Sequence, residues 1–323
     1  MRAVVVERTG PPEVLRVVEM ADPTPGAGQV VVAVRFAGIA FVDTQLRAGT
    51  APVPAPPLPY VPGTAVGGTV IAVGEDVDND WLGVDVVTST GRSDGYATRA
   101  AAAVADLHRV PATVDLLSAT ALLTDGRTAV GLARAATIDR DDTVAVTAAA
   151  GGVGSLLVQL AAHDGATVVA LAGSDAKLGH ARQVGASAGI NYRHASWPND
   201  LTAVAPDGID VAFDGVGGDV TAALFAHVRP GGRYLPHGAA SGSLARVAPD
   251  DAAQRRVTVI PLSNIAATPA DSFRLAEEAF ALAGGGVIRP LVGQTYPLEA
   301  AADAHAAIDA RTTVGKTLLV VSD

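Results

Sequence analysis

The sequence predicts an α/β protein with two domains, one built on a doubly wound parallel sheet and the other rich in β-strands. Its 323 residues suffice for two domains of roughly 100–200 residues each. Hydrophobic residues make up 49% of the chain and charged residues only 17%, which supplies two cores and argues against long disordered segments. The apolar pattern also changes near residue 118, from short strand-like runs to alternating strands and helices.

Residues 1 to about 110 have the character of a β-rich domain. Short β-branched runs at 2–8, 28–39 and 67–77 are bounded by Gly, Pro and Asp, as strands usually are. Segment 50–63 holds six of the 20 prolines and is expected to be an irregular loop. The first domain is therefore predicted to be antiparallel and loop-rich.

Beyond this domain the chain alternates between strands and helices. A helical period starts in segment 115–136, with Asp115 and Ser118 as expected caps. Strands are then expected at 142–150, 166–173, 188–193, 208–218, 232–240 and 256–263, with helices between the earlier ones. Such alternation predicts a doubly wound parallel sheet, which we place at residues 118–265.

The last part of the chain reads as helix, strand, helix and strand, and is expected to rejoin the β-rich domain. The predicted domains are thus 1–117 together with 266–323, and 118–265.

A glycine-rich loop is the clearest functional motif. A β-branched strand leads into Gly151, Gly152 and Gly154, and an apolar helix follows. Glycines let the backbone turn tightly and approach a pyrophosphate, and the helix N-terminus offers unpaired N–H groups. A ligand-free glycine turn is the alternative. Because Ser155 and Leu156 follow, the Lys-Ser or Lys-Thr pair of a nucleoside triphosphate loop is missing.

The charge and composition exclude several classes of function. A net charge of −10 argues against nucleic-acid binding, which depends on cations. The absence of cysteine excludes disulfides, catalytic thiols and cysteine zinc sites. Since the chain shows neither a signal-peptide core nor an apolar run of about 18 residues, we expect a cytoplasmic protein without a membrane partner.

Four stretches give the chain a resemblance to a known family: 38–49, 58–74, 126–129 and 148–154. They resemble the zinc-independent quinone oxidoreductase (zeta-crystallin-like) branch of the medium-chain dehydrogenase/reductase superfamily, and the likeness runs over nearly the whole chain. It implies a GroES-like catalytic domain and a Rossmann domain with the active site in the cleft between them. It also implies hydride transfer from NADPH to a quinone or α,β-unsaturated carbonyl, and a homodimer joined through strand 256–263.

The resemblance also bears on metal binding. Zinc-dependent relatives carry Gly-His-Glu where this chain has Thr64 and Ala65 after Gly63. The seven histidines are scattered without ligand spacing. No metal is therefore expected.

The first motif departs from the quinone reductase pattern at two places. Ala40 and Gln45 stand where relatives usually have Asn and Tyr, whereas Asp43 and Arg47 remain. The loss of these polar groups leaves room for a bulkier acceptor than a simple quinone. For Asp43 two structural explanations stay open, a helix cap and an ion pair with Arg47 four residues on.

Hydride addition to a conjugated acceptor builds negative charge on its carbonyl oxygen, which a metal-free site stabilises with hydrogen-bond donors or with a proton from solvent. The candidate catalytic residues are Asp43, Gln45, Thr64 and Thr128, with Tyr60 as a further donor. The resemblance places Thr128 near the nicotinamide.

The resemblance also implies a set of cofactor contacts. His237 has two readings, a proton donor and a wall of the cofactor site. Thr124 is expected to precede or open a helix, as is Thr128. The remaining implied cofactor contacts, besides the three loop glycines, are Ala149, Val153, Val216, Gly238 and Ala239.

The turn after the second strand of the sheet indicates which cofactor is used. An NAD site has an acid at this strand end, but here Gly173 and Ser174 occupy it. Asp175 then falls at the helix start, as a cap or first-turn charge. Lys177 follows in the first turn, where a cation is unfavourable unless an anion such as a 2′-phosphate lies nearby. It is one of only two lysines beside 21 arginines (23 − 2).

Three further residues support NADPH. By the resemblance, Tyr192 packs on the adenine side and Arg193 approaches the phosphate, with Arg311 as a weaker candidate.

Three functions fit these features. The first is an NADPH-dependent quinone or enone reductase. The second is an enoyl-thioester or biosynthetic tailoring reductase of the same fold, and the third is a non-catalytic NADPH-binding regulatory or structural protein.

Overall fold

The computed structural model describes residues 1–91, 93–266 and 268–322, and the chain divides into two compact units. Unit 1 comprises Met1–Thr124 and Pro290–Asp323, and unit 2 comprises Asp125–Arg289. The C-terminal segment thus rejoins the first unit, but the boundaries lie after Thr124 and Arg289 instead of after residues 117 and 265.

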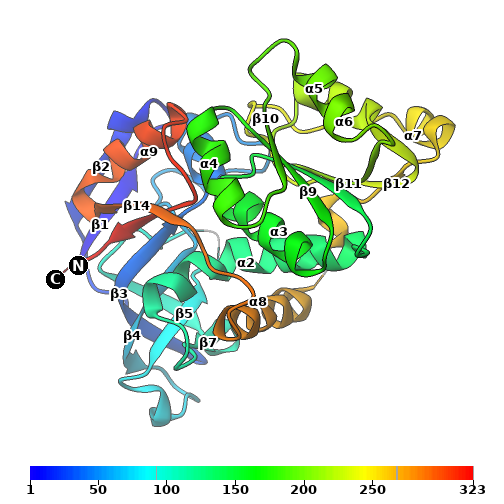
Figure 1. Ribbon diagram of the computed structural model, residues 1–323. Coiled ribbons are helices and arrows are strands. Elements are labelled where there is room, and N and C mark those ends of the chain that lie inside the picture. The colour runs from blue at the N-terminus through cyan, green and yellow to red at the C-terminus, as the bar shows by residue number, and fades with distance from the viewer. Residues whose placement is uncertain (92, 267, 323) are drawn as a thin grey trace. The chain divides into compact units, whose positions relative to one another are not determined.

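Unit 1 is built around one long strand, β3, with β15 and β4 on either side of it (Figure 1). The sheet order is β14-β15-β3-β4-β5-β7, with β6 also paired to β3, and β1 and β2 form a separate antiparallel pair. The bounds are β1 (Arg2–Val6), β2 (Leu15–Glu19), β3 (Gln29–Ile39), β4 (Ala65–Val73), β5 (Asp85–Ser89), β6 (Arg99–Ala103), β7 (Leu107–Arg109), β14 (Val292–Pro297), β15 (Lys316–Val320), α1 (Phe41–Ala48) and α9 (Ala301–Asp309).

The side chains of β3 explain its central place. Its alternating valines Val30, Val32 and Val34 are buried, as period-two apolar residues on one face of a sheet should be. Directly after β3 the chain turns into α1, which ends at Gly49 in a left-handed conformation (φ 76°), the usual glycine helix stop.

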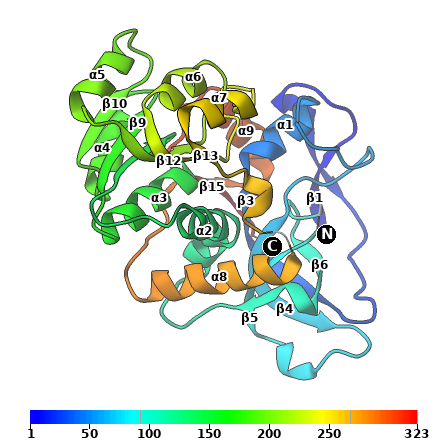
Figure 2. The ribbon, with the colours of Figure 1, turned by 90° about the vertical axis from the view of Figure 1, so that its right-hand side faces the viewer.

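Unit 2 is a doubly wound parallel sheet with the order β10-β9-β8-β11-β12-β13, which confirms the predicted fold class. Helices α3 and α4 cover one face, and α5 and α6 cover the other (Figure 2). The bounds are β8 (Thr143–Thr147), β9 (Thr167–Ala172), β10 (Ala188–Asn191), β11 (Ile209–Asp214), β12 (Val228–Pro236), β13 (Thr258–Val259), α3 (Gly152–His163), α4 (Asp175–Gln183), α5 (Trp197–Val204), α6 (Asp219–Ala226), α7 (Pro249–Arg255) and α8 (Pro269–Gly284). Because the strand order reverses between β8 and β11, ligands of such sheets bind at the carboxyl ends of these strands.

Helix α2 spans Leu116–Ala136, in agreement with the helical period expected over residues 115–136. Asp115 caps it by accepting a hydrogen bond from the Ser118 N–H (2.8 Å). Thr124 and Thr128 therefore lie within the helix, and the expectation that they precede or open it is wrong.

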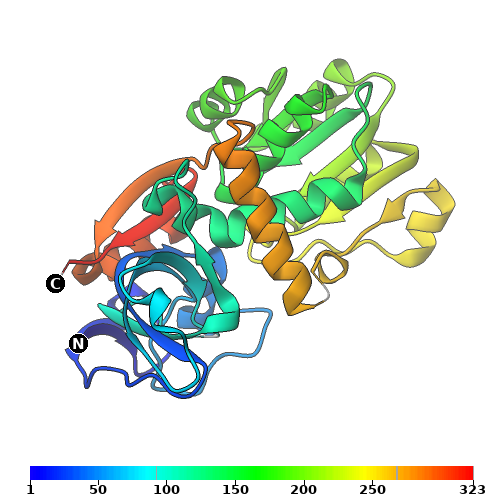
Figure 3. The same ribbon diagram turned by 90° about the horizontal axis from the view of Figure 1, so that it is seen from below.

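Helix α8 packs against α2 within unit 2 (Figure 3). A Cβ at Gly131 would overlap Ile265 and crowd Leu275, and Arg134 pairs with Glu278. This packing explains why the unit extends to Arg289, since the sequence alone had assigned α8 to the other domain.

The edge strand of the parallel sheet is shorter than expected. Only Thr258–Val259 of segment 256–263 form β13, and they pair in parallel with β12.

Among the residues that the structure describes, no helix is both long and apolar enough to cross a membrane.

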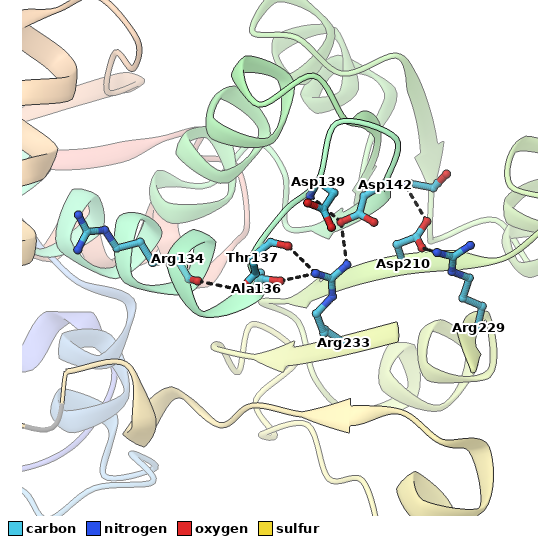
Figure 4. A network of polar contacts seen from close by, with 9 residues as sticks. Arg134, Ala136, Thr137, Asp139, Asp142, Asp210, Arg229 and Arg233 are labelled. Carbon is cyan, nitrogen blue, oxygen red and sulfur yellow. Dashed lines mark hydrogen bonds and ion pairs between the residues drawn. The ribbon is translucent and has the colours of Figure 1, made fainter. Parts of the chain in front are cut away.

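A polar network fastens the amino-terminal edge of the parallel sheet (Figure 4). Arg233 donates to the carbonyl oxygens of Ala136 and Thr137, at the end of α2, and forms an ion pair with Asp142 (2.7 Å). A helix C-terminus has carbonyls without intrahelical partners and favours a cation there. One side chain thus joins β12, the end of α2 and the start of β8, far from the carboxyl edge.

Replacing Arg233 by Ala should lower the free energy of unfolding by about 2–3 kcal/mol, because the largely buried Asp142 carboxylate loses its partner. The matched control is Arg274→Ala, since the Arg274–Asp271 pair is exposed and should contribute little to the free energy of unfolding. Urea unfolding measures both, and equal effects of the two substitutions would contradict this role.

Candidate functional site

The glycine loop between β8 and α3 forms a cradle for a phosphate group. A Cβ at Gly154 would overlap the Ala148 carbonyl oxygen, and one at Gly152 would overlap the Asp125 carboxylate. Ala148 itself adopts a positive φ of 48° to make the turn. At position 154 the overlap is with backbone, whereas a Cβ at position 152 would displace the Asp125 side chain. The two glycines thus keep the loop close to the N-terminus of α3, where backbone N–H groups suit the pyrophosphate of a dinucleotide.

The structure brings the predicted ribose-phosphate residues together at the ends of β9 and β10. A Cβ at Gly173 would lie 3.2 Å from Tyr192 Oη and 3.5 Å from Arg193 Nε. Ser174 caps α4, and its Oγ accepts from the Lys177 N–H (3.4 Å), which fixes Lys177 in the same turn. The hydroxyl of Ser174, the phenol of Tyr192 and the guanidinium of Arg193 thus lie at one turn, and Lys177 occupies the first turn of the helix that follows. Such donors suit a phosphate.

Asp175 has the role of a first-turn charge. It is the first residue of α4, and its Oδ1 accepts from Asn191 Nδ2 (3.2 Å). The helix cap is Ser174 and not Asp175, so of the two roles expected for Asp175 only the first-turn charge is found.

Asp214, at the end of β11, is a residue that sequence reasoning missed. It is fully buried and accepts hydrogen bonds from Thr147 Oγ1 (3.1 Å), Thr221 Oγ1 (2.8 Å) and the Tyr234 hydroxyl. The N–H of Val216 also donates to it (2.9 Å). These hydrogen bonds, led by that of Tyr234, outweigh burial and hold the pKa of Asp214 below its usual value. An acid directly before the Gly-rich turn 215–218 was the sequence signal that could have revealed it.

His237 lies at the carboxyl end of β12, against the glycine turn. A Cβ at Gly215 would lie 2.9 Å from His237 Nε2 and 3.5 Å from Ala148 Cβ. Burial lowers the pKa of His237, so the ring is neutral at pH 7 and is poorly suited to act as a general acid. The arrangement favours the wall over the acid.

The other predicted contacts on this edge are Ala149, Val153, Val216, Gly238 and Ala239. Gly238 has no room for a Cβ because of the Gly215 carbonyl, and Ala149, Val216 and Ala239 are buried. The loops after β8, β11 and β12 therefore meet along one edge of the sheet.

In unit 1, Asp43 lies at the third position of α1. Its Oδ2 accepts from the Ala40 N–H (2.8 Å) and from Tyr96 Oη (3.2 Å), so the helix-cap explanation is confirmed. Arg47 pairs with Asp309 instead. Burial raises the pKa of Asp43 to about 6.

Two other predicted catalytic residues, Gln45 and Thr64, also belong to unit 1. Gln45 is buried on α1. Thr64 precedes β4, and its carbonyl oxygen accepts from the Thr90 N–H (2.8 Å).

Lys316 is a second residue that sequence reasoning missed, although it is the only lysine besides Lys177. It starts β15, is 4% exposed and donates from Nζ to Thr124 Oγ1 (3.3 Å). Arg311 belongs to this unit too, where its guanidinium lies 4.4 Å from the centre of the Phe41 ring. Its cofactor contact stays a prediction.

The residues at the position of the zinc site of zinc-dependent relatives do not suit a zinc ion. Among the described residues no group of three or more His, Asp or Glu side chains is arranged to hold a metal. Thr64 and Ala65 offer neither imidazole nor carboxylate.

Replacing Asp214 by Asn should lower the free energy of unfolding by about 3 kcal/mol at pH 7. The amide nitrogen of Asn can only donate, so it would face hydroxyl and N–H groups that also donate and would leave them without an acceptor. The folded pKa of Asp214 is lowered, so its contribution is present above its unfolded value of 3.8 and is lost as pH falls through the folded pKa. Urea unfolding should show a constant gap between wild type and variant from pH 7 to 5, shrinking only below about 4. A gap that closes already near pH 6 would contradict the assignment.

Comparisons with known proteins agree with this geometry. The alcohol dehydrogenase GroES-like domain family matches residues 26–145, and the zinc-binding dehydrogenase family matches residues 184–319. A probable quinone oxidoreductase of Schizosaccharomyces pombe is 31% identical, over 98% of this chain and 96% of that protein.

Two solved structures are also similar over almost their whole length. A mycobacterial protein complexed with NADPH has a TM-score of 0.90 and 32% identity, and covers 99% of both chains. The Escherichia coli quinone oxidoreductase complexed with NADPH has a TM-score of 0.91 and 29% identity, over 99% of this chain and 100% of that one. The resemblance read from the motifs is confirmed, and the chain belongs to the quinone oxidoreductase branch of the medium-chain dehydrogenase/reductase superfamily.

Proposed function

We propose that the protein is an NADPH-dependent oxidoreductase that transfers a hydride to a quinone or an α,β-unsaturated carbonyl compound. The observation that carries this proposal is the turn after β9, where Tyr192 and Arg193 lie against Gly173 and Lys177 follows in the first turn of α4. A 2′-phosphate needs such donors, whereas a free 2′-hydroxyl prefers an acid. The NADPH complexes of two similar structures support the same cofactor.

Each part of the cofactor has residues suited to it. The backbone from Ala149 to Gly154 receives the pyrophosphate, and the ribose turn receives the 2′-phosphate. The turns around Val216 and His237–Ala239 form the wall on the nicotinamide side. When bound, NADPH supplies the hydride.

The chain's own task is to orient the acceptor and to stabilise the oxygen on which charge develops. Gln45, Thr64, Thr124 and Thr128 offer neutral donors for this, and Asp43 holds the first turn of α1 in place. Since Thr64 and Ala65 replace the metal-binding pair of zinc-dependent relatives, we propose that hydrogen bonds alone stabilise the charge.

A second candidate is an enoyl-thioester or tailoring reductase of the same fold. The observation that favours it is the pair Ala40 and Gln45, which replace larger or more specific polar residues of the quinone reductase pattern. A non-catalytic NADPH-binding protein is the third candidate. We retain a homodimer and a cytoplasmic location as predictions.

Consumption of NADPH with a panel of quinones, enones and enoyl thioesters separates these candidates. We expect turnover with at least one quinone or enone and slower turnover with the thioesters. Turnover of thioesters alone would favour the second candidate, and tight NADPH binding without any turnover would favour the third.

Replacing Lys177 by Ala should weaken NADPH binding about 10-fold and leave NADH binding within about twofold, because only NADPH carries the 2′-phosphate. The matched control is Arg182→Ala, which removes an exposed cation from the last turn of the same helix. Titration calorimetry measures both cofactors. Tighter binding of NADH than of NADPH by the wild type would overturn the cofactor assignment.

A further inference from the structure

A hydrogen bond joins the end of β10 to the start of α4, although the binding of a phosphate does not by itself require it. Asn191 is the last residue of β10, and its Nδ2 donates to Oδ1 of Asp175, the first residue of α4 (3.2 Å). Strand pairing brings the two residues together, because Asn191 lies opposite Ala172 in the register of β9 and β10. The bond thus links the two segments that form the ribose turn.

A second hydrogen bond fixes the direction in which the Asn191 amide faces. Its Oδ1 accepts from the backbone N–H of Arg193 (3.1 Å), and its backbone oxygen accepts from the His194 N–H (3.1 Å). Asparagine commonly closes a tight turn in this way. If the amide were reversed, its oxygen would face the Asp175 carboxylate and its NH2 group would face an N–H, so both contacts would be repulsive.

An amide of this length serves both partners at once, and closely related side chains do not. An aspartate at position 191 accepts from the Arg193 N–H but places a second carboxylate against Asp175. The hydroxyl of a serine accepts from the same N–H, but the side chain is shorter and lacks the amide nitrogen that contacts Asp175. The donor to Asp175 can therefore be removed while the acceptor of the turn is kept.

Asp175 has to satisfy two opposing requirements. The helix dipole favours an acid in the first turn of α4, and Asp175 provides it. A 2′-phosphate is repelled by an acid, however, and an acid near this strand end is the group that binds the free 2′-hydroxyl of NAD. Asp175 lies only two residues after Gly173, against which Tyr192 and Arg193 lie. It is exposed, so its side chain can adopt several rotamers unless a hydrogen bond selects one.

We propose that Asn191 is a positioning residue for cofactor selectivity. Its amide holds the Asp175 carboxylate at the end of β10, where the acid stabilises α4 without binding the ribose hydroxyls of NADH or approaching the 2′-phosphate of NADPH. The proposal rests on the cofactor site of the proposed function. It gives Asn191 an effect on the choice between two cofactors through Asp175, without contact with either cofactor.

The test compares Asn191→Ser with the wild type by calorimetric titration with NADPH and with NADH. The substitution removes the donor to Asp175 and keeps an acceptor for the Arg193 N–H. It should lower the ratio of NADPH affinity to NADH affinity about 5-fold, because the released carboxylate weakens the binding of NADPH and strengthens that of NADH. A purely structural role would lower both affinities together and leave their ratio unchanged, which would overturn the proposal.

Removing Asp175 as well tests whether Asn191 acts through it. In the Asp175→Ala background, Asn191→Ser should change the affinity ratio by less than about twofold, since no carboxylate is left to release. Asp175→Ala alone should also leave the ratio within about twofold of the wild-type value, because the acid is already held in place. An equal loss of selectivity with and without Asp175 would contradict the role given to Asn191.

The matched control is Asn199→Ser, the same substitution at an exposed position of α5, which should leave both affinities within about twofold. Asn191→Asp provides a second route if Asn191→Ser does not fold. It also keeps the acceptor and loses the donor, so an unchanged affinity ratio in this variant would count against the proposal. The titrations need no acceptor substrate. A wild type that binds NADPH but reduces no acceptor would therefore refute the reductase function, whereas the affinity ratios would still decide the role of Asn191.

Discussion

The carboxylate of Asp214 is the interaction on which the cofactor edge of the parallel sheet depends. It is buried at the end of β11, next to the point where the strand order reverses, and it collects hydrogen bonds from β8, α6, β12 and the turn that follows β11. Three loops with little apolar content are thereby held in fixed positions. Without this anion the glycine turn would present several unpaired donors in a dry interior, which is costly. Hydrogen bonds to this carboxylate, more than hydrophobic packing, thus fix the positions of the loops at this edge of the sheet.

The fold class could be predicted because the periodicity of apolar residues changes where the parallel sheet begins. The boundaries could not, since they depend on packing between distant segments. Helix α8 is amphipathic in either unit, and only its contact with Gly131 and Arg134 on α2 assigns it to unit 2. Likewise, only two residues of β13 pair with β12, although all eight residues of segment 256–263 have the character of a strand. The strand propensity of a segment does not determine over how many residues a neighbouring strand lies beside it.

Some residues of the candidate site could likewise be predicted from the sequence, and others could not. The glycine loop and the ribose turn were found from the sequence because their chemistry is local: missing Cβ atoms, a cap and a first-turn cation lie within a few residues of one another. Asp214 and Lys316 were missed because their hydrogen bonds join residues that lie from 20 to 192 positions apart in the sequence. The contact of Arg311 with the Phe41 ring was missed for the same reason, since the two residues lie far apart in the sequence.

The two lysines show how composition could have gone further. Arginine serves as the surface cation of this chain, and its planar fork suits bidentate pairs such as those with Asp142 or Glu278. Lysine offers a compact charge on a slender apolar stem, which can lie along a glycine backbone and end at a single oxygen. Lys316 does this over Gly38, whereas Lys177 lies in the first turn of α4, where its charge opposes the helix dipole. A cation type kept for only two positions is itself a signal, and the buried Lys316 is the residue that this signal could have revealed.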